Sequence, residues 1–306
     1  MNLKPSNQSN LYGLDTFFHE FIELYNKNKL PNKILLTGSK GIGKSTMSYH
    51  LINFVLSKNE DYPYDITNHK INIENKSFKL IQNNTCPNFI LIDVPFEKKM
   101  IDISQIRNMI LNLNKSSFNS KPRFILIDNI ELLNLNSINA LLKILEEPNK
   151  NIYFILIGNN KKVLPTLSSR CINFKLSLSY DESLFVCQKL LKRDLNDLIN
   201  KDLMNYYLTP GKIYQLIEFF NEKEVDLTKY NLNDFVNLII SENYYKKNPS
   251  IKFILFEFIE LFLINKISIK SFEFYNYFLN QFEKVKKFNL DEETLFLEFE
   301  DKILNG

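Results

Sequence analysis

The sequence of 306 residues contains no tryptophan, three cysteines, three histidines and only 7 glycines. Cys86, Cys171 and Cys187 are too few and too scattered for a disulfide framework, and no four-ligand zinc spacing occurs. We therefore expect no zinc and a reducing, cytoplasmic environment. Residues 1–10 do not resemble a signal peptide, and no apolar run is free enough of charge to predict a membrane span.

The net charge of +3 is too small to indicate a nucleic-acid-binding surface by itself. At this length more than one domain is expected. Continuous apolar runs predict strands buried on both faces, and helical patterns lie between these runs, which are residues 33–38, 88–93, 123–128 and 152–157. Strands that alternate with helices need crossover connections, so the pattern predicts an α/β domain with a parallel sheet.

Beyond about residue 176 the pattern becomes helical throughout. Helices are expected at 181–191, 194–207 and 212–220, followed by a polar linker near 223–231 and further Phe- and Leu-rich helices. The sequence predicts three parts: an α/β domain over residues 1–177, a small helical lid over 178–222 and an all-helical C-terminal domain over 223–306.

Three of the scarce glycines lie within six residues, between a predicted strand and a predicted helix. They belong to a match to the phosphate-loop pattern G-x-x-x-x-G-K-[ST], formed by Gly38, Ser39, Lys40, Gly41, Ile42, Gly43, Lys44 and Ser45. Backbone N–H groups of such a loop surround phosphates, and the following helix presents its positive N-terminal end. Lys44 is expected to reach the β and γ phosphates, and Ser45 to hold Mg²⁺.

A phosphate loop is usually paired with an acidic residue that ends an apolar strand. Asp128 ends such a run and is the predicted Mg²⁺ partner, with Asp93 as the alternative because its run is equally apolar. In many ATPases of this kind the next residue is a glutamate that polarises the attacking water. Here it is Asn129, which cannot accept a proton at neutral pH, so hydrolysis is expected to be poor.

Four segments together resemble the AAA+ subunits of bacterial clamp loaders over about residues 9–215: residues 30–45, 127–134, 139–148 and 164–171. The missing glutamate and the short chain resemble the delta-prime type of subunit more than the motor type. The resemblance implies a P-loop NTPase (AAA+) domain with a lid and a helical C-terminal collar, which binds ATP or ADP with Mg²⁺. It also implies other clamp-loader subunits, motor and delta, as partners, with the sliding clamp contacted indirectly and primed DNA within the assembly.

The same resemblance implies several site residues. Arg170, in the segment Ser-Arg-Cys, would be an arginine finger that acts in trans on nucleotide bound by a neighbouring subunit. Tyr12 would pack against the adenine or lie in the core, and Lys212 would contact the nucleotide from the lid or simply begin a helix. The position at the end of the fourth strand that senses the γ-phosphate falls on Gly158 or Asn159, with Asn160 beside them.

Two other functions remain open at this point. One is a self-sufficient AAA+ ATPase, either a clamp-loader motor subunit or a related branch-migration motor, and Asn129 is the feature that separates it from a non-motor subunit. The other is a P-loop nucleotide kinase, which leaves the Ser-Arg-Cys segment unexplained. Basic residues that in clamp loaders lie near DNA are more simply a solvated surface here: Lys98, Lys99, Arg107, Lys115 and Lys121.

Overall fold

The computed structural model describes residues 3–95, 98–114, 119–147, 151–159, 165–204, 208–265, 272–288, 290 and 292–304. The chain divides into two compact units, Met1–Ser179 and Tyr180–Gly306, and each is described by itself. The further division of the second unit into a lid and a C-terminal domain stays a prediction.

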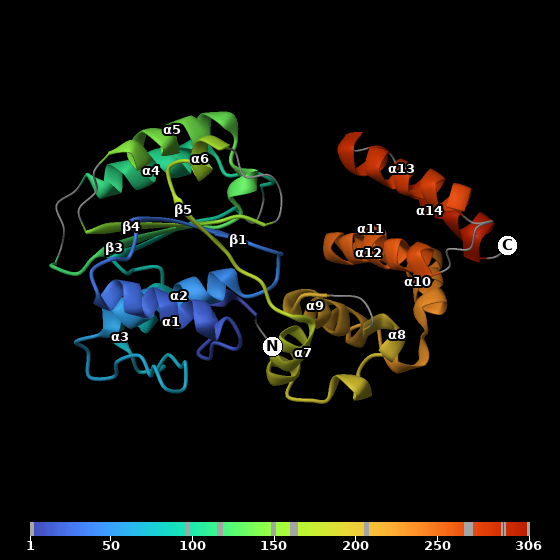
Figure 1. The fold of residues 1–306 in the computed structure, drawn as a ribbon, viewed down its shortest axis with the longest axis horizontal. Helices are drawn as coiled ribbons and strands as arrows, with labels where there is room; N and C mark the ends of the chain where they lie inside the picture. Colours follow the sequence, from blue (N-terminus) through green and yellow to red (C-terminus); the bar gives the residue numbers. More distant parts are fainter. Residues whose placement is uncertain are drawn as a thin grey trace. The chain divides into compact units, whose positions relative to one another are not determined.

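The first unit is built on a parallel sheet of five strands in the order β2-β3-β4-β1-β5 (Figure 1). The strands are β1 (Lys33–Thr37), β2 (Phe89–Ile92), β3 (Arg123–Ile127), β4 (Ile152–Ile157) and β5 (Ile172–Lys175). Four of them match the predicted apolar runs. The expected burial on both faces is wrong for β2, because it is an edge strand and Leu91 is 38% exposed.

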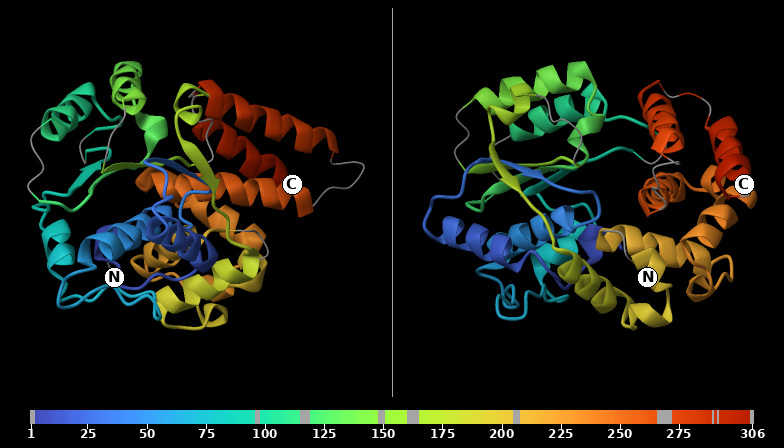
Figure 2. Two further views of the ribbon diagram at one scale, coloured as in Figure 1. Left: turned by 60° about the vertical axis from the view of Figure 1, so that its left-hand side comes forward. Right: turned by 45° about the vertical axis from the view of Figure 1, so that its right-hand side comes forward.

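Helices cover both faces of this sheet, with α1, α2 and α3 on one side and α4, α5 and α6 on the other (Figures 1 and 2). Their bounds are α1 (Asp15–Asn26), α2 (Lys44–Ser57), α3 (Lys76–Gln82), α4 (Ile103–Leu113), α5 (Leu135–Glu146) and α6 (Pro165–Ser168). Short 3₁₀ helices occur at η1 (Pro5–Asn7) and η2 (Ile130–Leu132). Side chains cap the start of three of these α-helices: Asn75 caps α3, Asp102 and Gln105 form a capping box for α4, and Asn134 caps α5.

The second unit is helical, as predicted. Its helices are α7 (Tyr180–Leu191), α8 (Lys201–Met204), α9 (Pro210–Asn221), α10 (Leu232–Ser241), α11 (Tyr244–Lys247), α12 (Pro249–Asn265), α13 (Phe272–Phe288) and α14 (Glu293–Phe299). The 3₁₀ helices η3 (Leu195–Asp197) and η4 (Leu227–Lys229) and a π-helical turn, η5 (Glu300–Leu304), complete it.

The expected continuous helix over 194–207 is wrong for the residues that the structure describes there, 194–204, which form η3 and α8 instead. Asp194 accepts a hydrogen bond from the backbone of Asn196, and Asn200 accepts one from the backbone of Asp202. Such local bonds compete with a continuous helical ladder.

One hydrophobic cluster runs through the second unit from Cys187 on α7 to Phe299 on α14. Aromatic rings pack within it edge to face, such as Phe235 against Phe258 with centroids 5.0 Å apart and Phe278 against Phe299 at 5.3 Å. Such pairs contribute about 0.5–1.5 kcal/mol each beyond the burial of their area. Within the described residues, no helix is long and apolar enough to cross a membrane.

Candidate nucleotide-binding site

The phosphate loop lies between β1 and α2, as the sequence predicts, and its three glycines have a backbone that other residues rarely adopt. Gly38 has φ +144°, Gly41 +91° and Gly43 +97°. At Gly38 there is also no room for a side chain, because a Cβ atom would lie 2.3 Å from the carbonyl oxygen of Leu176. Any other residue at these positions would strain the backbone, and at Gly38 it would also clash with Leu176.

Lys44 is buried at the start of α2 with only 4% of its surface exposed. Its Nζ donates hydrogen bonds to the carbonyl oxygens of Gly38 at 2.8 Å and Ser39 at 2.7 Å. Burial lowers the pKa of Lys44 to about 8, although Asp128 and Glu131 act in the opposite direction. The lysine is thus curled over a loop at a helix N-terminus, an arrangement that fits a nucleotide's phosphates.

Asp128 follows β3 and lies beside Ser45, so the structure brings the two predicted Mg²⁺ residues together. Burial raises the pKa of Asp128, and the nearby carboxylate of Asp93 raises it further. The Ser45 hydroxyl and the backbone N–H of Asn129 act against these effects by hydrogen bonding to the carboxylate. Hydroxyl and carboxylate oxygens are suitable Mg²⁺ ligands.

A hydrogen-bonded row of four polar side chains crosses the carboxyl ends of β2, β3 and β4. Asn129 donates from Nδ2 to Asp93 Oδ1 at 2.8 Å, and its Oδ1 accepts from Asn159 Nδ2 at 3.0 Å. Asn159 Nδ2 also donates to Glu131 Oε1 at 2.8 Å, and its backbone N–H donates to Glu131 Oε2 at 3.3 Å. Glu131 was not predicted as a site residue. The one feature of the sequence that could have indicated it is its position three residues after Asp128.

The sequence leaves the γ-phosphate-sensing position open between Gly158 and Asn159. Gly158 is buried and its N–H donates to the carbonyl oxygen of Leu36. Asn159 carries the side chain that joins the polar row, which favours it as the sensing residue. Asn160 lies outside the described residues.

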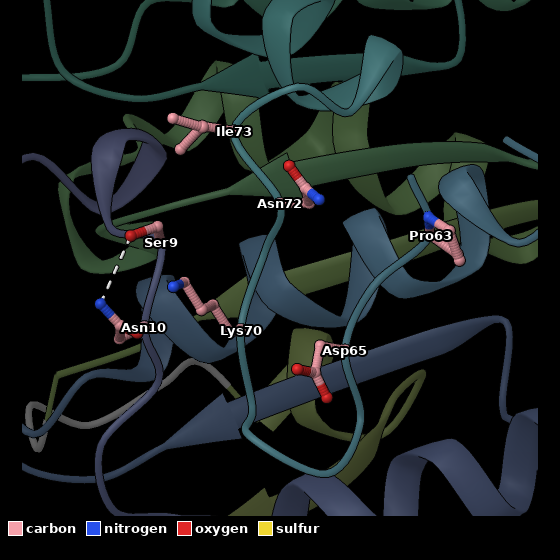
Figure 3. A pocket seen from close by; sticks show the side chains of 7 residues that line it. All are labelled: Ser9, Asn10, Pro63, Asp65, Lys70, Asn72 and Ile73. Atoms are coloured by element: carbon pink, nitrogen blue, oxygen red, sulfur yellow. Dashed lines mark hydrogen bonds between the residues drawn. The ribbon is translucent and has the colours of Figure 1, made fainter. Parts of the chain in front are cut away.

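Tyr12 is half-buried and is not part of the core, and its stacking on adenine stays a prediction. The segment before it is held by the loop around residue 70: Leu11 N–H donates to the carbonyl oxygen of His69, and Ile71 N–H donates to that of Ser9. Figure 3 shows the hollow of about 470 Å³ beside this contact. Its lining residues are Ser9, Asn10, Pro63, Asp65, Lys70, Asn72 and Ile73, and none belongs to the phosphate loop.

Arg170 lies after α6 in the first unit with 32% of its side chain exposed. Its Nε donates to Oε1 of Glu146 at 3.0 Å, its Nη2 donates to the same oxygen, and its Nη1 donates to the carbonyl oxygen of Thr166 at 2.9 Å. The next residue, Cys171, is buried, and burial raises the pKa of its thiol to about 11, as expected for an unreactive cysteine.

Lys212 lies in the first turn of α9 in the second unit and forms an ion pair with Glu257 of α12. Its predicted contact with nucleotide stays a prediction. Of the basic residues considered for DNA, Lys98 pairs with Asp102, and Lys121 pairs with Glu60 at 3.0 Å. Lys99 and Arg107 are exposed, and Lys115 lies outside the described residues.

Among the described residues, no group of three or more His, Cys, Asp and Glu side chains is arranged to hold a metal ion. Cys86 is half-buried, and Cys171 and Cys187 are buried as free thiols.

Comparison with known proteins decides the family. Residues 13–179 match the model of the family described as "DNA polymerase III, delta subunit", which is more than half of the chain. The chain belongs to this family. A curated relative is the DNA polymerase III subunit delta' of Buchnera aphidicola subsp. Baizongia pistaciae, which is 30% identical over 171 residues, 53% of this chain and 49% of that protein.

The DNA polymerase III subunit gamma of Buchnera aphidicola subsp. Schizaphis graminum is 32% identical over 178 residues, 56% of this chain and 46% of that protein. The chain thus spans about half the length of the curated relatives it matches. A gamma subunit-related protein from Thermotoga maritima shares the fold with a TM-score of 0.51 and 19% identity, over 91% of this chain and 96% of that one. The fold and the family together make the chain an AAA+ protein of the clamp-loader family.

Proposed function

We propose that this chain is a non-motor subunit of the replicative clamp loader. It binds ATP or ADP with Mg²⁺ at the phosphate loop and supplies Arg170 to an adjacent ATPase subunit during loading of the sliding clamp onto primed DNA. The observation that carries the proposal is Asn129, which directly follows Asp128 and is fixed by hydrogen bonds to Asp93 and Asn159.

Nucleotide binding is supported by the loop geometry and by Lys44. Phosphates would replace the two carbonyl oxygens that its ammonium group now contacts, and they are stronger acceptors because they carry charge. Bound Mg²⁺ would neutralise charge on the phosphate oxygens, with Ser45 and Asp128 as the residues that hold it. The amide of Asn129 cannot accept a proton from a water molecule, so we expect the site to bind nucleotide but to hydrolyse it very slowly.

Donation of Arg170 is supported by its exposure and by its planar group, which can bind two phosphate oxygens at once. An arginine supplied in trans accelerates phosphoryl transfer by about 10³–10⁵-fold in other systems. Partners are inferred from the relatives: the curated proteins similar to this chain are named as gamma and delta' subunits of DNA polymerase III.

The test is steady-state ATP turnover by the isolated chain, followed by co-purification with motor and delta subunits and ATPase assays of the assembly. We expect bound nucleotide, very slow turnover alone, and strong stimulation only in the assembly. Turnover by the isolated chain near the enzyme median of about 10 s⁻¹ would instead support the self-sufficient AAA+ ATPase.

A further inference from the structure

The side chain of Asn129 is engaged at both ends. Its Nδ2 donates to Asp93 Oδ1 at 2.8 Å, and its Oδ1 accepts from Asn159 Nδ2 at 3.0 Å. Its backbone N–H donates to Asp128 Oδ1 at 2.8 Å, in a left-handed conformation with φ +54°. Two neighbours, Asp93 and Asn159, therefore set the orientation of the side-chain amide, and Asp128 contacts the backbone beside it.

Asp93 occupies the equivalent level of the neighbouring strand. Ile92 of β2 pairs with Ile127 of β3, so Asp93 and Asp128 are the next residues of two adjacent parallel strands. The charge of Asp93 contributes to the raised pKa of Asp128, which also places the two carboxylates close together. Asp93 Oδ1 accepts a second hydrogen bond from the N–H of Val94 at 2.7 Å, which fixes the carboxylate.

We infer that Asp93 and Asn129 form an exchanged carboxylate–amide pair: a carboxylate, that of Asp93, follows β2, and an amide, that of Asn129, directly follows Asp128, which is the reverse of the order that would favour hydrolysis. Asp93 is a positioning residue, because its hydrogen bond holds the Asn129 amide in place and the site then binds nucleotide without hydrolysing it. The inference rests on the proposed nucleotide site and goes beyond it. It attributes the expected lack of ATP turnover to the positions of two groups, the Asp93 carboxylate after β2 and the Asn129 amide after β3.

Exchange of the two groups would supply the missing step. In hydrolysis the oxygen of a water molecule bonds to the γ-phosphorus of ATP while the bond from that phosphorus to the bridging oxygen breaks. The electron pair of the broken bond leaves with ADP, and the carboxylate introduced at position 129 accepts the proton of the water. The amide introduced at position 93 would donate to that carboxylate, so the hydrogen bond between the two positions is kept with donor and acceptor reversed.

The experiment compares ATP turnover and ATP affinity for wild type, Asp93→Asn, Asn129→Glu and the exchange D93N/N129E. We expect the exchange to be about 10²-fold faster than wild type, in line with general-base contributions of about 10²–10⁴, with ATP affinity changed less than about threefold. Asn129→Glu alone should raise ATP turnover much less, because its carboxylate would face that of Asp93 and the two like charges would repel each other. Asp93→Asn alone should not raise ATP turnover, because position 129 still carries an amide.

Two results of this comparison would overturn the inference: an exchange variant that binds ATP normally but is no faster than wild type, or an Asn129→Glu variant as fast as the exchange. Failure of wild type to bind ATP would count against the proposed function instead. Thermal unfolding of Asp93→Ala, Asn129→Ala and the double variant tests separately whether the two side chains interact.

Each alanine variant removes the same hydrogen bond, so the double variant should lower the midpoint of unfolding by clearly less than the sum of the two single shifts. Additive shifts would show that the two side chains act independently and would contradict the exchanged pair. This measurement needs neither nucleotide nor a partner.

Discussion

Arg170 donates from both Nε and Nη2 to a single carboxylate oxygen, Oε1 of Glu146 at the end of α5. A guanidinium held at two nitrogens has few orientations left, while its third nitrogen, Nη1, contacts the Thr166 carbonyl. Because Glu146 itself is 57% exposed, the pair lies at the surface and can be exchanged for another acceptor. A phosphate of a neighbouring subunit would be such an acceptor.

Replacement of Arg170 tests this directly. Arg170→Ala should leave the nucleotide affinity of the isolated chain within about twofold, because the phosphate loop does not depend on it. In the reconstituted assembly, DNA- and clamp-stimulated ATPase should fall, by an amount limited to the active sites that use this arginine. Arg193→Ala, an exposed arginine of the second unit, is the matched control. Unchanged clamp loading with Arg170→Ala would refute the finger assignment.

Lys44→Ala should weaken ATP binding by about tenfold or more, which is about 1.4 kcal/mol or more, because it removes the buried ammonium group of the loop. Isothermal titration calorimetry measures the change. Lys40→Ala serves as the control, since Lys40 is exposed in the same loop and its backbone contribution is kept. Equal losses for both variants would mean that general positive charge, and not the position of Lys44, supports binding.

The lowered pKa of Lys44 predicts a pH dependence of ATP affinity. The ammonium group loses its proton near pH 8 without nucleotide, while bound phosphates favour the charged form and raise the pKa. Binding above pH 8 must therefore take up a proton, so affinity should fall by about tenfold between about pH 7 and pH 9. Calorimetry at several pH values tests this, and Lys44→Ala should show no such fall. A flat profile for wild type would contradict a titrating Lys44.

The two glycines at the ends of the loop should differ in their tolerance of alanine. Gly43→Ala meets only Leu14 Cδ1 at 3.8 Å, so its cost is the positive φ alone, about 1–3 kcal/mol. Gly38→Ala adds a Cβ atom 2.3 Å from the Leu176 carbonyl oxygen and should lower the unfolding midpoint further or prevent folding. Differential scanning calorimetry compares them. Similar midpoints would show that the backbone around Leu176 can yield.

Some of this structure could be predicted from the sequence because the information is local. The phosphate loop is contiguous, and the scarcity of glycine made Gly38, Gly41 and Gly43 stand out. Asp128 and Asp93 could both be placed at strand ends, but the choice of roles depended on the order of β2 and β3 in the sheet.

Other features depend on contacts between distant segments. Strand β5 was not predicted because it has four residues at an edge of the sheet, and Ile172 there is 55% exposed, so no buried run marks it. The bonds from Asn159 to Asn129 and Glu131 depend on side-chain rotamers and strand register, which no spacing in the sequence determines. The sequence can predict that polar residues after apolar runs lie at the carboxyl edge of the sheet. It cannot predict which of these residues form hydrogen bonds with one another.

The polar row that ends β2, β3 and β4 also bears on how the protein folds. Asp93 and Asn129 are 36 residues apart in the sequence, and Asn129 and Asn159 are 30 apart, so their meeting requires the crossovers of the parallel sheet to close first. Contacts of such long range form slowly and contribute little to early folding. Nucleotide would then recognise the finished sheet and not its precursors, so it would slow unfolding without accelerating folding.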